Sequence, residues 1–80
     1  MSKAEKLRAK FRLAESQFKW DELVALLLHL GFQQFQAEGS RVFFTKGVVT
    51  IKLHRPHPQK EVKMYVVRQV REILEREGLL

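Results

Sequence analysis

Apolar residues recur at helical spacing in several segments of this chain. In residues 3–18 they follow one another at alternating three- and four-residue steps between basic side chains, which predicts a narrow amphipathic helix. The stripe consists of Ala4, Leu7, Phe11, Ala14 and Phe18. Its two phenylalanines favour packing on the domain itself, although a basic amphipathic helix can also lie on a membrane surface or on RNA.

A second helix is predicted over residues 20–30, with two acidic residues in its first turn, where the helix dipole favours anions. Its broad apolar face holds Trp20, Leu23, Val24, Leu27, Leu28 and Leu30. Gly31 ends this helix, and His29 lies on the opposite, polar side, which predicts a solvated surface histidine.

A third helix begins near residue 62 and ends before the stop signal Gly78. Its predicted buried face holds Val62, Val66, Val70, Ile73 and Leu74, with Val67 at the flank. Valine is a poor helix former, so this helix depends on docking against the rest of the domain.

Period-two alternation between the second and third helices predicts short strands at residues 32–38, 41–45 and 48–54. The turns fall at Gly39 with Ser40 and at Lys46 with Gly47, which gives an antiparallel meander. With Lys46 and Gly47 as the central turn residues, Arg41 faces Lys52 across the strands. The inward face then holds Val42, Phe44, Val49 and Ile51, and the other holds Arg41, Phe43, Thr45, Thr50, Lys52 and His54.

This order of elements predicts an α+β domain in two layers, with helices on one face of a three-stranded antiparallel sheet. Eighty residues suffice for a single domain, here divided into a basic helical extension at residues 1–18 and a core at 19–80. The chain has no cysteine, and its first residues lack the apolar run of a signal peptide. We therefore expect a cytoplasmic protein that does not enter a membrane.

Positive charge is concentrated along the chain rather than spread evenly. The net charge is +6, and residues 39–60 contain five Lys or Arg, two of the three histidines and no Asp or Glu. Such asymmetry favours a polyanion as partner, with solubility alone as the other explanation. Arg41 opposite Lys52 fits an anion that binds between them, unless both side chains extend into solvent.

The run HRPHP at residues 54–58 carries the candidate chemistry, because prolines restrict the backbone around His54 and His57. Cleavage of RNA without a metal needs a base for the 2′-hydroxyl, an acid for the leaving oxygen and cations for the phosphate. His54 and His57 are the acid–base candidates; the cations of the same stretch, the RNA-binding candidates, are Arg41, Lys46, Lys52, Arg55 and Lys60. From the residues alone, binding of a polyanion without catalysis remains the alternative.

Neither a metal nor a small-molecule cofactor is expected. The two histidines lie off any helix, and no carboxylate or thiolate in the stretch completes a coordination sphere. A glycine-rich phosphate loop and a serine nucleophile constellation are also missing from the sequence.

Several runs of the sequence resemble the HicA-type toxins of bacterial toxin–antitoxin systems. They are WDELVALLLHLGF, GSRVFF, the strand that ends in HRPHP, and VVRQVREILEREG, and they cover residues 20–80. The resemblance implies a fold like that of double-stranded-RNA-binding domains and an mRNA endonuclease that acts independently of translation. It also implies a HicB-like antitoxin as partner.

The chain departs from this family at one position. Family members typically carry a histidine soon after the GS turn, in a GSHxxF-like pattern, whereas this chain has Arg41 there. Arginine binds phosphate but does not give up its proton near neutrality, so Arg41 cannot act as the base. Three interpretations are open. His54 or His57 has the titrating role instead, or the protein binds RNA or a partner without cleaving RNA. In the third, Arg41 is a substitution that inactivates the nuclease.

Overall fold

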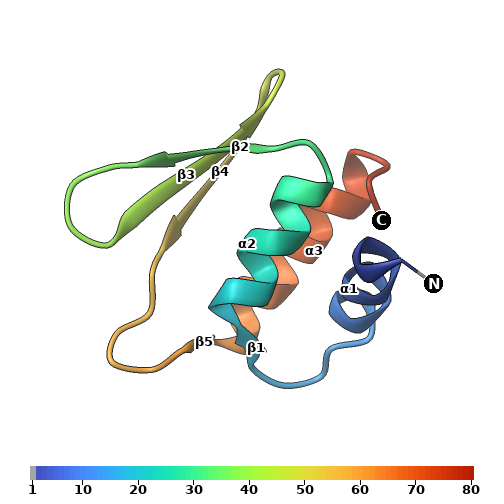
Figure 1. Cartoon of the computed structure of the whole chain (residues 1–80), viewed down its shortest axis with the longest axis horizontal. Coiled ribbons are helices and arrows are strands. Elements are labelled where there is room, and N and C mark those ends of the chain that lie inside the picture. Colours follow the sequence, from blue (N-terminus) through green and yellow to red (C-terminus); the bar gives the residue numbers. More distant parts are fainter. Residues whose placement is uncertain (1) are drawn as a thin grey trace.

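The computed structural model describes residues 2–80, and within them the chain forms α-helices and short β-strands (Figure 1). Their order is α1 (Lys3–Arg12), β1 (Phe18–Lys19), α2 (Trp20–His29), β2 (Gln33–Gln36), β3 (Arg41–Lys46), β4 (Val49–His54), β5 (Glu61–Val62) and α3 (Met64–Arg76). The three-stranded antiparallel sheet has the order β2-β3-β4, and β1 pairs with β5 in a separate ribbon. The predicted α+β class is confirmed.

One face of the three-stranded sheet packs on helices, and the other face is open (Figure 1). Val42, Phe44, Ile51 and Leu53 are buried on the packed face. The ring of Trp20, at the start of α2, meets that of Phe44 edge-on, with 6.2 Å between centroids. This arrangement leaves the opposite side chains of the strands to solvent.

The hairpin between β3 and β4 turns one residue later than predicted. Lys46 pairs with Val49, so Gly47 and Val48 are the central turn residues. Gly47 has a φ of +59°, and a glycine at the first central position is typical of a type II′ turn. The register therefore moves by two residues: Arg41 faces His54 rather than Lys52. Because side chains alternate with period two, the division of the strands into two faces survives the error.

Glycines end α2 and α3 where predicted. At the end of α2, Gly31 has a φ of +98°, its N–H donates to the Leu28 carbonyl, and the next N–H, of Phe32, donates to Leu27. These two bonds are the Schellman motif that a left-handed glycine permits. The exposed His29 lies at the end of α2, as expected of a surface histidine.

The ribbon of β1 and β5 was not predicted, and it takes residues from the predicted ends of the first and third helices. The first helix ends at Arg12 rather than near residue 18, and Phe18 pairs with Val62 across the ribbon. Val62 therefore precedes α3 instead of belonging to it. In α3 the fully buried side chains are Val67, Val70 and Leu74, whereas Val66 and Ile73 are half-buried.

Helix α1 packs on α2 and α3, on the side of them that lies away from the sheet (Figure 1). Leu7 and Phe11 are buried, and the Phe11 ring meets Phe18 edge-on at 5.2 Å. The Arg71 guanidinium donates to the carbonyls of Phe11 and Ala14 at 3.0 and 2.6 Å. Helix α1 thus contributes buried side chains to the core. None of the helices in residues 2–80 has the length and apolar character needed to cross a membrane.

Candidate nucleic-acid interface

The open face of the sheet is made by alternate side chains of β2, β3 and β4. Across the strands they form three rows: Gln33, Thr45 and Thr50; Phe35, Phe43 and Lys52; and Arg41 with His54. The three strands contain no Asp or Glu. The open face therefore offers cations, hydroxyls and aromatic rings, with no carboxylate from its own strands.

His54 sits at the end of β4, directly opposite Arg41 at the start of β3. Its Nδ1 lies 3.3 Å from the hydroxyl of Ser40, and the Ser40 carbonyl accepts a bond of 2.7 Å from the Arg55 N–H. The turn before β3 thereby fixes the end of β4. Ser40 was not predicted to be a site residue. The signal that could have identified it is its position in the GS turn, directly before the strand that begins with Arg41.

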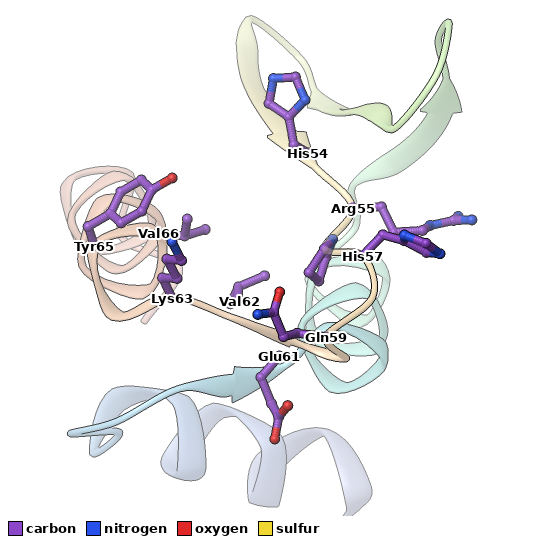
Figure 2. Close-up of a pocket in the computed structure, with 10 residues that line it drawn as sticks. His54, Arg55, His57, Gln59, Glu61, Val62, Lys63, Tyr65 and Val66 are labelled. Carbon is purple, nitrogen blue, oxygen red and sulfur yellow. The ribbon is translucent and has the colours of Figure 1, made fainter.

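In the segment that follows β4, side chains point in a different direction from that of His54 (Figure 2). Figure 2 shows the side chains of Arg55 and His57 pointing in the same direction, away from the ring of His54. On that side a cavity of about 300 Å³ is lined by Trp20, Asp21, Arg55, Pro56, His57, Pro58, Gln59 and Lys60. The side chains of His54 and His57 therefore point in different directions, and His57 lies beside the first turn of α2.

A second cavity, of about 260 Å³, lies between the segment after β4 and the start of α3 (Figure 2). It is lined by His54, Arg55, Pro56, His57, Gln59, Glu61, Val62, Lys63, Tyr65 and Val66. Lys63 and the exposed Tyr65 add a cation and a phenol that the sequence pattern did not point to. His54 thus stands between the open sheet face and this cavity.

Two further predicted cations, Lys46 and Lys60, lie at different places in the fold. The Lys46 Nζ donates to the Leu30 carbonyl at 2.8 Å, which ties it to the end of α2 on the packed side of the sheet. Gly31 leaves room for this contact, since a Cβ there would lie 2.5 Å from the Lys46 Nζ. Lys60 is exposed beside β5, where its carbonyl accepts from the Trp20 N–H at 2.9 Å. Neither lysine lies on the open face.

The open face groups Arg41 and His54 with Lys52, whose Nζ lies 5.9 Å from the centre of the Phe43 ring. Phe35 lies opposite Phe43 on the neighbouring strand and is 49% exposed. The sequence pattern left Phe35 without a role. Among residues 2–80, no three His, Asp or Glu side chains cluster closely enough to hold a metal ion.

The fold and this surface define a small, basic α+β domain with one covered and one open sheet face. A family model described as "HicA toxin of bacterial toxin-antitoxin" matches residues 20–78. The chain therefore belongs to the HicA toxin family of bacterial toxin–antitoxin systems, a membership that implies a cognate antitoxin as partner. No curated protein and no solved structure matches the chain. The matched residues begin at α2, so α1 lies outside the family model.

Proposed function

We propose that this protein is a metal-independent endoribonuclease that cleaves mRNA in the cytoplasm, independently of the ribosome, and that a HicB-like antitoxin neutralises it. Membership of a toxin family supports this function. The observation that carries it is the placement of His54: exposed, opposite Arg41, and within hydrogen-bond distance of Ser40 through Nδ1. A ring nitrogen held in this way leaves Nε2 for the substrate.

In the proposed reaction His54 Nε2 takes the proton of a 2′-hydroxyl. The 2′ oxygen then attacks the adjacent phosphorus, the bond from phosphorus to the 5′ oxygen breaks, and that oxygen receives a proton from solvent. The products end in a 2′,3′-cyclic phosphate and a 5′-hydroxyl. For Nε2 to accept a proton, Nδ1 must carry the hydrogen and donate it to the Ser40 hydroxyl.

Arg41 and Lys52 serve this reaction as cations. Both lie on the open face, Arg41 directly opposite His54 and Lys52 two residues before it on the same strand. Charge-assisted bonds from arginine to phosphate are stronger than neutral ones and favour the charge that builds up during attack. His54 thus provides, from the facing strand, the titrating group that Arg41 cannot provide. Arg55 and Lys60 bind flanking phosphates in this proposal.

The antitoxin acts in this proposal by covering the open face. A surface that carries Arg41 and Lys52 without a carboxylate from its own strands is matched by an acidic partner. Occupation of this surface would exclude RNA from His54.

The test is cleavage of labelled mRNA by purified protein in EDTA, with the product ends identified. We expect cyclic-phosphate ends, and His54→Ala should lower the rate about 100-fold or more, because a general base contributes at least that much. His29→Ala is the matched control, because His29 is an exposed histidine on α2. His57→Ala should keep most of the activity.

Equal rates for wild type and His54→Ala would refute the assignment of the base. Loss of activity in His57→Ala alone would assign the role of general base to His57, in the loop after β4. Cleavage abolished by EDTA and restored by a divalent cation would refute the metal-independent mechanism.

A non-catalytic RNA-binding module with a fold like double-stranded-RNA-binding domains is the second candidate. The side chains of His54 and His57 point in different directions (Figure 2), and arginine stands at position 41, where the family typically has histidine; both observations favour this candidate. Salt-sensitive RNA binding without any cleavage would establish this function. Cleavage gained on Arg41→His would show that arginine disarms the nuclease.

A further inference from the structure

The two phenylalanines on the open face are arranged as neighbours across the strands. Phe35 is the only apolar residue of β2, lies opposite Phe43 and is 49% exposed. Phe43 is half-buried, and the Lys52 Nζ lies 5.9 Å from its ring centre. Two aromatic rings and a cation therefore form one row across all three strands.

The position of Phe35 is not explained by the core. Every residue of β2 is exposed, and the helices pack on the other face. A single exposed apolar residue needs no explanation, but a pair of rings flanked by cations is the composition of surfaces that stack nucleic-acid bases. The charged and titratable side chains of this face are Arg41, Lys52 and His54, without a carboxylate from its strands, which fits the phosphates of a nucleic acid.

We propose that the open face binds single-stranded RNA, with unpaired bases stacked on Phe35 and Phe43. The proposal rests on the proposed function for its placement beside a cleavage site, and it adds the class of substrate. Bases in a duplex present only their edges in the grooves, so a flat row of rings selects strands whose bases are free to stack.

The row that contains Phe35 and Phe43 is next to the row that contains His54, the proposed general base. Phe43 and Arg41 are two residues apart in β3, a separation of about 7 Å along a strand. Lys52 and His54 are spaced in the same way on β4. A base stacked on Phe43 therefore brings its neighbouring phosphate to the row that contains Arg41 and His54.

The experiment measures binding of the full chain to strands of about 12 nucleotides, within the usual range of single-strand site sizes. The probe is a single-stranded RNA with every 2′-hydroxyl methylated, so that it resists transesterification. An abasic strand of equal length and charge and a duplex of the same sequence are compared with it. Stacking predicts that wild type binds the base-bearing strand roughly tenfold more tightly than the abasic strand.

Phe35→Ala should lose the part of this preference that Phe35 contributes, with the Phe43 part kept, while its affinity for the abasic strand stays unchanged, because only stacking is removed. Phe35→Leu should behave like Phe35→Ala, and Phe35→Trp should keep the preference, which separates a ring from a merely apolar side chain. The matched control is Leu28→Ala, since Leu28 is 47% exposed on α2 and lies away from this face.

Tighter binding to the duplex than to the single strand would overturn the proposal, as would equal binding of wild type and Phe35→Ala to the base-bearing strand. If Phe35→Ala weakens only capture of the cognate antitoxin, the face is a protein interface and the proposal fails. The outcomes are separable from those of the cleavage test: a protein that cleaves but ignores Phe35 refutes this inference alone, and one that stacks bases but never cleaves refutes the nuclease alone.

Discussion

At the scale of single residues, Ser40 links the turn before β3 to the histidine at the end of β4. Its hydroxyl lies 3.3 Å from His54 Nδ1, and its carbonyl accepts from the Arg55 N–H. A serine hydroxyl accepts or donates with equal ease, so it supports whichever tautomer the reaction uses. Ser40 is therefore a positioning residue for His54 and need not touch RNA.

Replacement of Ser40 by alanine should lower kcat roughly fivefold, the effect of one lost neutral hydrogen bond, and leave KM unchanged. The measurement is steady-state cleavage across a pH series, because a freed imidazole changes the profile whereas a purely structural role does not. Ser16→Ala is the control, since Ser16 is exposed in the segment after α1. An unchanged kcat and pH profile would contradict the role given to Ser40.

The sequence predicts which residues share the open face, but not which of them meet. Alternation places Arg41, Lys52 and His54 together for any register that differs by an even number of residues. Their pairing depends on the turn, and the turn depends on whether Gly47 takes the first or the second central position. Contacts such as Ser40 with His54 follow only from the correct register.

At the scale of elements, the helices were predictable because their signals are local. Gly31 and the apolar spacing before it define α2 without reference to any other segment. The ribbon of β1 and β5 has no such signal, since two residues show no period. Phe18 and Val62 each fit the apolar stripe of a neighbouring helix, and only tertiary pairing assigns them to strands.

Phe11 should carry much of the energy that holds α1 in place. It is fully buried against Phe18, so Phe11→Ala is expected to lower the free energy of unfolding by about 3–5 kcal/mol. Leu13→Ala, at a residue 75% exposed, should change it by less than about 0.5 kcal/mol. Urea unfolding followed through the buried Trp20 measures both values.

Phe11→Leu keeps the experiment informative if the alanine variant does not fold. We expect an intermediate loss of stability, with RNA cleavage per folded molecule unchanged because α1 lies away from the open face (Figure 1). A stable Phe11→Ala variant that loses cleavage would contradict a purely structural role for α1.

At the scale of the whole molecule, two of the basic surfaces lie well apart. One is the open sheet face with Arg41 and Lys52, and the other is α1, whose exposed residues include Lys3 and Lys6. The sheet and α1 lie on different sides of α2 and α3 (Figure 1). One RNA strand on the sheet face would therefore leave the cations of α1 unused.

The salt dependence of RNA binding should distinguish these surfaces. Each phosphate contact with a single strand adds roughly −0.7 to the slope of log affinity against log salt. Arg41→Ala and Lys52→Ala should each reduce the slope by about that amount, whereas Lys6→Ala should leave it unchanged. Titrations of the 2′-methylated strand at several salt concentrations provide the measurement. A smaller slope in Lys6→Ala would place RNA on α1 instead.

The contact between Arg71 and the end of α1 joins residues sixty positions apart, so it forms only after α3 has been synthesised. Helix α1 is synthesised before α3, so its carbonyls at Phe11 and Ala14 have to wait for the guanidinium that donates to them. The ribbon of β1 and β5 waits in the same way, because Phe18 pairs with Val62. All three strands of the sheet are synthesised after β1 and before β5. A nascent chain therefore contains every proposed site residue of the open face before β5 and α3, which complete the fold, have been made.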